Sequence, residues 1–294
     1  MRPADWVRIV SLAAIWGASF LLIRIASPAL GPAPTAVVRL LVGGGLLAIY
    51  VRVRGESFGL RRNWRQYLLL GVVNSGLPFL CNNLAALTVP ASYLTVLNAT
   101  TPFMGTLMAA GLMREKVTAR QGIALGLALA GVGMVAGLGP LQVGFPELLG
   151  IAGGLAGAAL YAAAALLIQR MALTTPANAQ ASVSQLAAGL VLAPLWGVFP
   201  GADPLDPKAL VAALVLGAVC SGIAYMLYFR LVVDIGARRT LTVTFLSPPF
   251  GILWSVLVLG EEVTALSLAG TALIVIGTAI LLGAGRRAGN DPIQ

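Results

Sequence analysis

Long apolar segments alternate with short polar turns along the whole chain. Most of these segments approach the roughly 20 helical residues that cross a bilayer core of about 30 Å. They lack the alternating polar positions that line the lumen of a β-barrel, so the pattern predicts an all-α integral membrane protein. The ten expected transmembrane helices lie near residues 6–27, 35–51, 66–86, 91–112, 121–139, 148–169, 179–199, 209–229, 239–259 and 265–284.

A second regularity is the return of the first half of the pattern in the second half. The offset is 146 residues, which is the separation of Pro102 from Pro248. At the same offset the segment 70–76 aligns with 216–222 without a gap. Self-similarity at a fixed offset is the signature of an internal repeat, so we interpret the chain as a duplication of one structural unit.

The number of spans in each copy decides how the copies are oriented. Five is odd, so the second copy enters the membrane from the opposite side and is inverted. We therefore expect two inverted five-helix repeats, residues 1–145 and residues 146–294, around a central cavity.

The positive charges agree with this arrangement. Of the 19 Lys and Arg residues, 16 fall at the face that carries both termini, Lys208 falls at the other face, and Arg24 and Arg39 lie within spans. By the positive-inside rule, both termini are expected in the cytoplasm. The net charge of +9 is explained by the positive residues that gather at the cytoplasmic face of a membrane protein, so no nucleic-acid partner is expected.

Composition excludes several classes of protein. A content of 59% hydrophobic and 10% charged residues is incompatible with the polar surface of a soluble domain. The chain has no histidine, and Cys81 and Cys220 lie in apolar segments, so we expect neither a metal site nor a cofactor. No Asp or Glu lies near the middle of a span. An intramembrane enzyme and a proton antiporter both usually need titratable groups there, so we expect no enzyme and favour either a facilitator or a form of coupling that the sequence does not show.

Prolines interrupt equivalent spans, at Pro102 in the fourth and at Pro248 and Pro249 in the ninth. Each removes a backbone hydrogen bond, which frees the carbonyl of Asn98 in the first copy and of Thr244 in the second. A free carbonyl at this depth must meet another helix, a side chain or cavity water. The prolines indicate either a hinge or gate beside a central path, which we favour, or a packed kink.

Uncharged polar and aromatic side chains gather in a few spans. They are expected to face inward, where they either bond neighbouring helices or line a cavity that suits an amphipathic or aromatic solute better than an ion. The candidate cavity residues are Trp16, Asn82, Asn83, Tyr93, Asn98, Tyr161, Tyr225, Ser247 and Trp254.

Arg24 and Arg39 are the charges placed firmly within spans. One interpretation is that each extends to the interface or packs on a backbone carbonyl. The alternative is that one of them anchors a substrate carboxylate.

Several of these residues form a pattern similar to a known family. Residues 16–20 read Trp-Gly-Ala-Ser-Phe, Arg39 lies in the second span, and each copy has proline, then Glu115 or Glu261, then glycine. This pattern resembles the EamA-type members of the drug/metabolite transporter superfamily, and within them the YddG-type aromatic amino acid exporters. The resemblance implies a ten-helix inverted-repeat basket in the bacterial inner membrane that exports small metabolites. The sixth span departs from it, with Tyr161 near the place of the tryptophan motif.

These observations predict a secondary transporter that exports small amphipathic metabolites, amino acids and aromatic ones among them, by alternating access. Its partners would be the lipid bilayer and a small-molecule substrate, with no obligate protein partner. The alternatives are an exporter of drugs or other metabolites with the same fold, and a solute channel.

Overall fold

The computed structural model describes residues 2–113, 117–137, 144–171, 173–236, 240 and 242–288. Ten helical spans run through these residues, which confirms the predicted fold class. Glu115 lies outside the described residues. Among the described residues, five spans are both long and apolar enough to cross a membrane, namely the first, second, third, sixth and eighth. Shorter apolar helices form most of the fifth, ninth and tenth.

The first repeat consists of five spans. They are α1 (Pro3–Leu30), α2 (Pro32–Val53), a third built from α3 (Leu60–Gly71), η1 (Val72–Gly76) and α4 (Leu77–Ala85), a fourth built from α5 (Ala91–Asn98) and α6 (Thr101–Met113), and α7 (Ala119–Gly137).

The second repeat has the same order of spans. They are α8 (Phe145–Met171), α9 (Ala177–Leu192) continued by η2 (Ala193–Gly197), an eighth built from α10 (Pro207–Val215), η3 (Leu216–Ile223) and α11 (Ala224–Ile235), then α13 (Thr242–Leu259) and α14 (Ala265–Ala288).

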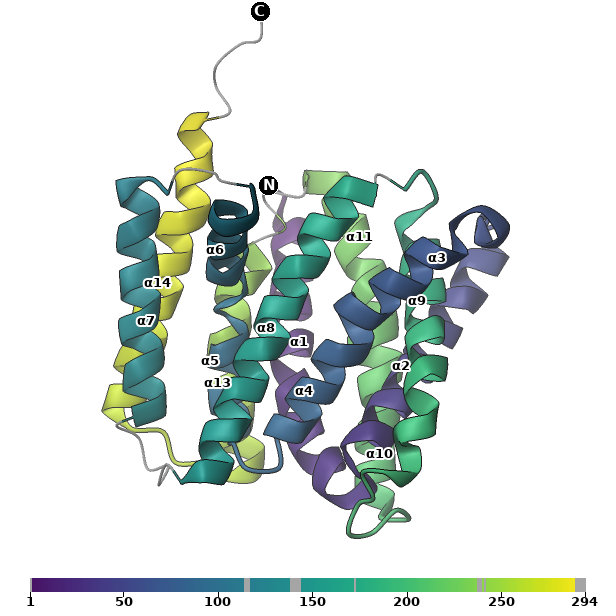
Figure 1. Cartoon of the computed structure of the whole chain (residues 1–294), viewed down its shortest axis with the longest axis horizontal. Helices are drawn as coiled ribbons and strands as arrows, with labels where there is room; N and C mark the ends of the chain where they lie inside the picture. The colour runs from purple at the N-terminus through teal and green to yellow at the C-terminus, as the bar shows by residue number, and fades with distance from the viewer. Residues whose placement is uncertain are drawn as a thin grey trace, which may run out of the picture.

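The packing of the helices follows the inverted repeat. Equivalent helices pair at the two ends of the molecule, α7 with α14 and α2 with α9 (Figure 1). Between these pairs, α1 packs against α13 and the eighth span, and its counterpart α8 packs against α6 and the third span. The start of α1 and the end of α14, and with them both ends of the described chain, lie at the same face of the bundle (Figure 1). The two five-helix repeats therefore meet around the centre of the molecule, where α1 and α8 stand.

The third and eighth spans contain π-helical turns at equivalent places. η1 and η3 overlap the aligned segments 70–76 and 216–222. Each turn begins beside a glycine that lies against the opposite repeat. Gly71 lies so close to the Ser184 carbonyl on α9 that a side chain there would overlap it, and a Cβ at Gly217 would lie 2.6 Å from Val42 Cβ on α2. π-Helical turns often occur at functional sites, so the side chains beside these two turns are candidates for functional residues.

The two prolines behave differently in the two repeats. The fourth span is broken between Asn98 and Thr101, immediately before Pro102, and the freed Asn98 carbonyl accepts a hydrogen bond from Thr101 Oγ1 at 2.7 Å. In contrast, α13 continues as a helix through Pro248 and Pro249. The discontinuity expected for both spans is thus found in one of them, and the hinge role of the prolines stays a prediction.

Glycines make the contact of α13 with α1 and α5 tighter than the equivalent contact of α6 with α8. A Cβ at Gly17 on α1 would lie 2.8 Å from the Gly251 backbone N on α13, and a Cβ at Gly251 would overlap Thr95 on α5. At the equivalent interface, a Cβ at Gly105 on α6 meets Ala162 on α8 only at 3.8 Å. The inverted symmetry is therefore broken, with close backbone packing among α1, α5 and α13 and looser packing between α6 and α8.

We expect Gly251→Ala to destabilise the protein, because the added methyl group overlaps Thr95. Overpacking of this kind costs about 1–3 kcal/mol, which should lower the midpoint of thermal unfolding in detergent by several degrees. Gly133→Ala is the matched control, since Gly133 has nothing within 4 Å of an added Cβ, and alanine favours the helix. Equal unfolding midpoints for wild type and Gly251→Ala would contradict the close crossing.

Candidate functional site

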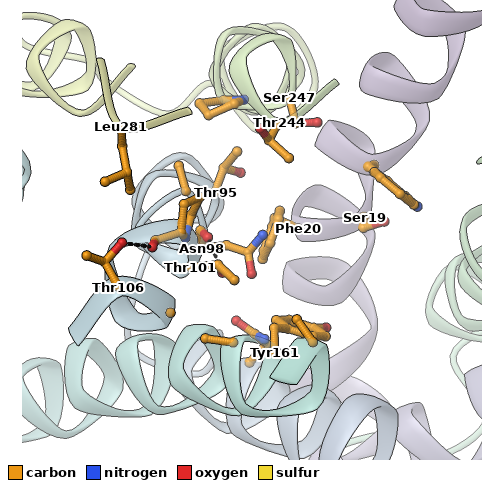
Figure 2. A pocket seen from close by; sticks show the side chains of 18 of the residues that line it. Ser19, Phe20, Thr95, Asn98, Thr101, Thr106, Tyr161, Thr244, Ser247 and Leu281 are labelled. Carbon is orange, nitrogen blue, oxygen red and sulfur yellow. Dashed lines mark hydrogen bonds between the residues drawn. The ribbon is translucent and has the colours of Figure 1, made fainter. Parts of the chain in front are cut away.

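A cavity of about 670 Å³ lies between the two repeats (Figure 2). Its volume is in the range of about 300–1,000 Å³ that is usual for small-molecule sites. It is lined from both repeats, with Thr95 and Asn98 from α5, Val117 just before α7 and Gln121 in the first turn of α7. Since α7 starts at the face that carries the termini, the cavity extends toward that face.

Most of the candidate site residues line this cavity. They are Trp16, Arg39, Asn82, Asn98, Pro102, Tyr161, Tyr225, Ser247 and Pro248. Further lining residues that sequence reasoning missed include the aromatic side chains Phe20 and Phe79 and the amide of Gln121. Nothing in the spacing distinguished these from ordinary core residues.

Five candidates lie away from the cavity: Asn83, Tyr93, Trp254, Arg24 and Pro249. Asn83 Nδ2 donates to the Pro32 carbonyl at 2.8 Å, and Trp254 Nε1 donates to the Ala14 carbonyl at 3.1 Å. Arg24 donates to the carbonyls of Ala86 and, at 3.0 Å, Leu87, at the end of the third span. These three side chains join helices to one another.

The other two candidates have different surroundings. Tyr93 is buried within the largest apolar cluster of the core. Pro249 is exposed on α13, so its side chain points outward from the bundle. Both residues therefore lie outside the cavity wall.

Arg39 brings a positive charge to the cavity wall. Its side chain comes from α2 and is only 6% exposed. The guanidinium carbon lies 3.7 Å from the centroid of the Phe79 ring, and Nε donates to Ser221 Oγ at 2.8 Å. No carboxylate forms an ion pair with Arg39 in the part of the chain that the structure describes. A buried charge without a counterion is costly, so this arrangement is suited to an anionic ligand, which the planar guanidinium can bind through two hydrogen bonds.

The repeat offset explains how Arg39 is held. Gln185 occupies the position equivalent to Arg39 in the second repeat, and its Nε2 donates to the Ser221 carbonyl at 3.3 Å. Ser221 belongs to the π-helical turn η3 and is completely buried. Two equivalent side chains therefore converge on one serine, but only the first repeat supplies a charge. The offset of 146 identifies Gln185 as the equivalent of Arg39 from the sequence, but not their common contact with Ser221.

Aromatic rings form another part of the wall. The Trp16 ring on α1 lies 5.5 Å from that of Tyr228 and 6.4 Å from that of Tyr225, both on α11. Tyr225 in turn packs edge-on against Phe229 at 5.8 Å. Rings at these separations form a rigid apolar surface against which a flat or aliphatic group can pack.

A carboxylate joins two helices at the face opposite the termini. Glu261, just after α13, accepts hydrogen bonds from the Ala91 backbone N at 2.8 Å and from the Ser92 backbone N and Oγ at 3.0 and 2.6 Å. These groups form the first turn of α5, where a negative charge is favoured by the unpaired N–H groups and the helix dipole. Glu261 therefore joins the end of α13 to the start of α5 on the side away from the cavity mouth.

Comparisons with known proteins agree with this architecture. The uncharacterized transporter YwfM of Bacillus subtilis (strain 168) is 23% identical over 292 residues, which cover 95% of this chain and 94% of its own. A protein of known crystal structure aligns over 99% of this chain and 100% of its own, with a TM-score of 0.70 and 19% identity. At that identity the likeness shows a shared fold.

The family comparison covers both repeats. The EamA-like transporter family matches residues 7–137 and again residues 148–283. Because these two matches span most of the chain, the protein belongs to the EamA-like transporter family of membrane transporters.

Proposed function

We propose that this transporter exports small amphipathic carboxylates, chiefly amino acids with aromatic side chains, from the cytoplasm across a bacterial inner membrane. The observation that carries the proposal is the buried Arg39, which faces the cavity without a carboxylate partner among the described residues. A substrate carboxylate would supply the missing negative charge.

The rest of the cavity suits such a solute. Trp16, Phe79 and Tyr161 present aromatic surface around the charged anchor. A phenyl or indole side chain would pack against this surface while its carboxylate reaches Arg39. A cationic drug, the alternative substrate of this fold, would meet an unbalanced positive charge in the same place.

Alternating access is supported by the unequal closure of the two faces. Glu261 joins α13 to α5 on the side away from the termini, and Gly17 and Gly251 pack α1 closely on α13 near the middle of both helices, while the cavity reaches the side that carries the termini. With the termini in the cytoplasm, as the arginine distribution favours, this is the conformation that loads substrate for export. We propose that residues 1–145 and 146–294 move against each other to open the other face, with the break before Pro102 as a hinge.

Uptake into proteoliposomes tests the proposal. Purified protein should take up labelled phenylalanine with saturation, and unlabelled phenylalanine should compete. Phenethylamine, which has the ring and the amine without the carboxylate, should compete poorly. Competition by phenethylamine equal to that by phenylalanine would contradict the carboxylate anchor. Uptake that rises linearly with concentration would favour the channel alternative.

The proposal assigns a positioning role to Ser221, because its hydroxyl fixes Arg39 Nε. We expect Ser221→Ala to raise the KM for phenylalanine about fivefold, as for the loss of one hydrogen bond to a charged group, with little change in maximal rate. Ser255→Ala is the matched control, since among the described residues that buried hydroxyl bonds within α13 alone, to the Gly251 carbonyl. Equal KM values in the two variants would show that the Ser221 hydroxyl does not position Arg39 for substrate binding.

A further inference from the structure

Two amide oxygens in the cavity wall have no hydrogen-bond partner among the described residues. They are Oδ1 of Asn82 and Oδ1 of Asn98, and both are buried. Buried polar atoms are nearly always paired, and unpaired ones in a ligand cavity indicate a group that the ligand supplies. We infer that these two oxygens form an acceptor site for the ammonium group of the substrate, so that the transporter selects zwitterionic amino acids over simple carboxylates. This inference rests on the proposed function.

The orientation of Asn82 is fixed by its surroundings. Its side chain is 2% exposed, and Nδ2 donates to the Pro78 carbonyl at 2.8 Å, one turn earlier on α4. The backbone of α8 packs on the same amide, since a Cβ at Gly157 would lie 2.8 Å from Nδ2. With the nitrogen held in this way, Oδ1 is the atom left to accept a hydrogen bond.

Asn98 stands at the break of the fourth span. Its backbone carbonyl already accepts from Thr101 Oγ1, and the two residues lie together on the wall of the cavity in Figure 2. The side-chain oxygen is separate from this bond and is buried without a partner. The helix break therefore places an acceptor at the cavity wall, and the backbone group that the break frees is satisfied locally.

Both acceptors come from segments that pack on α8, and Asn82 also follows the residue that contacts Arg39. Gly157 on α8 contacts Asn82, and a Cβ at Gly154, one turn away, would lie 2.9 Å from Leu97 Cδ1, next to Asn98. Asn82 lies three residues after Phe79 on α4, and the guanidinium of Arg39 stacks on the Phe79 ring. Residues three apart share a helix face, so Asn82 lies on the face of α4 that carries Phe79 and, against it, Arg39. An α-amino acid carries its carboxylate and ammonium on one carbon and can reach both.

The charges of the wall explain the selectivity. Arg39 is the one charged residue among the described residues that line the cavity. A simple amine would meet this positive charge without a carboxylate to offset it. A simple carboxylate would satisfy Arg39 but leave both amide oxygens unpaired. Sites that bind a substrate N–H group strongly reject analogues without it, because the buried acceptors are then left unsatisfied.

Competition against labelled phenylalanine uptake tests the inference. Phenylpropionate is phenylalanine without its amine, so the ratio of the two inhibition constants isolates the amine. We expect wild-type protein to prefer phenylalanine at least about tenfold. Asn82→Leu and Asn98→Leu should each reduce this preference about tenfold while phenylpropionate inhibits as in wild type. Thr106→Val is the matched control, since Thr106 also lines the cavity but its hydroxyl bonds to the Pro102 carbonyl at 3.1 Å.

A second variant covers the case in which the leucine variants do not fold. Asn98→Asp places a carboxylate at the acceptor site, and phenethylamine should then compete about tenfold better than in wild type. An unchanged response to phenethylamine, or a preference for phenylalanine that survives both leucine substitutions, overturns the inference. If wild type transports phenylalanine and phenylpropionate equally, the inference fails but the proposed function stands. If it transports neither, the proposed function fails.

Discussion

Replacing Arg39 with Gln is expected to lower kcat/KM for phenylalanine about 100-fold, mainly through KM. Removal of one partner from a buried, hydrogen-bonded charge pair costs about 2–5 kcal/mol. The pair of Arg39 and the substrate carboxylate exists only in the bound state, so this cost lowers the binding free energy of the substrate. Phenylpropionate, which shares the carboxylate, should lose affinity to the same extent. Uptake kinetics in proteoliposomes measure both effects.

Two further variants separate charge from geometry. Arg24→Gln removes the other arginine of the spans, which bonds to the Ala86 and Leu87 carbonyls away from the cavity, and should leave selectivity unchanged. Arg39→Lys keeps the charge but loses the planar fork and its stacking on Phe79, so it should recover only part of the affinity. A normal preference for carboxylates in Arg39→Gln would show that Arg39 is structural.

Replacing Glu261 with Ala is expected to open the face opposite the termini. The substitution removes three hydrogen bonds at the start of α5. A net loss of about 2 kcal/mol would shift the conformational equilibrium roughly 30-fold toward states in which α5 and α13 separate. Thr95, which lines the cavity and touches Gly251, then becomes accessible from that face.

A labelling rate measures this shift. Thr95→Cys, in a background with Cys81 and Cys220 replaced by Ala, would be treated in intact cells with a maleimide that cannot cross the membrane. We expect labelling about tenfold faster with Glu261→Ala than without it. Glu262→Ala is the matched control, because the neighbouring carboxylate is exposed. Labelling that Glu261→Ala does not accelerate would show that Glu261 does not hold this face closed.

The sequence predicted the ten spans and their inverted order because both depend on long-range regularities, the length of apolar runs and the 146-residue offset. Breaks within individual transmembrane helices were less predictable. Pro102 follows a helix break and Pro248 does not, although the repeat makes them equivalent. The difference lies in tertiary packing: α13 is held against α1 at Gly17 and Gly251, whereas Thr101 satisfies the carbonyl at the break.

The candidate site was predictable in kind but only partly in membership. Arg39 and Asn98 stood out as polar groups within spans, and both line the cavity. Asn83 and Trp254 stood out for the same reason but bond to neighbouring helices. In a membrane helix the lipid-facing side and the packed side are both apolar, so hydrophobic periodicity does not indicate which polar residues face a cavity. Phe79 was missed because a phenylalanine in a span carries no such signal.

Exchange across proteoliposome membranes tests the central claim of a carrier with one amino-acid site that opens to one face at a time. Vesicles preloaded with unlabelled phenylalanine should take up labelled phenylalanine faster than empty vesicles, with a transient accumulation above equilibrium, because a loaded site returns carrying the internal amino acid. The same time course in preloaded and empty vesicles, without saturation, would contradict alternating access and indicate a channel.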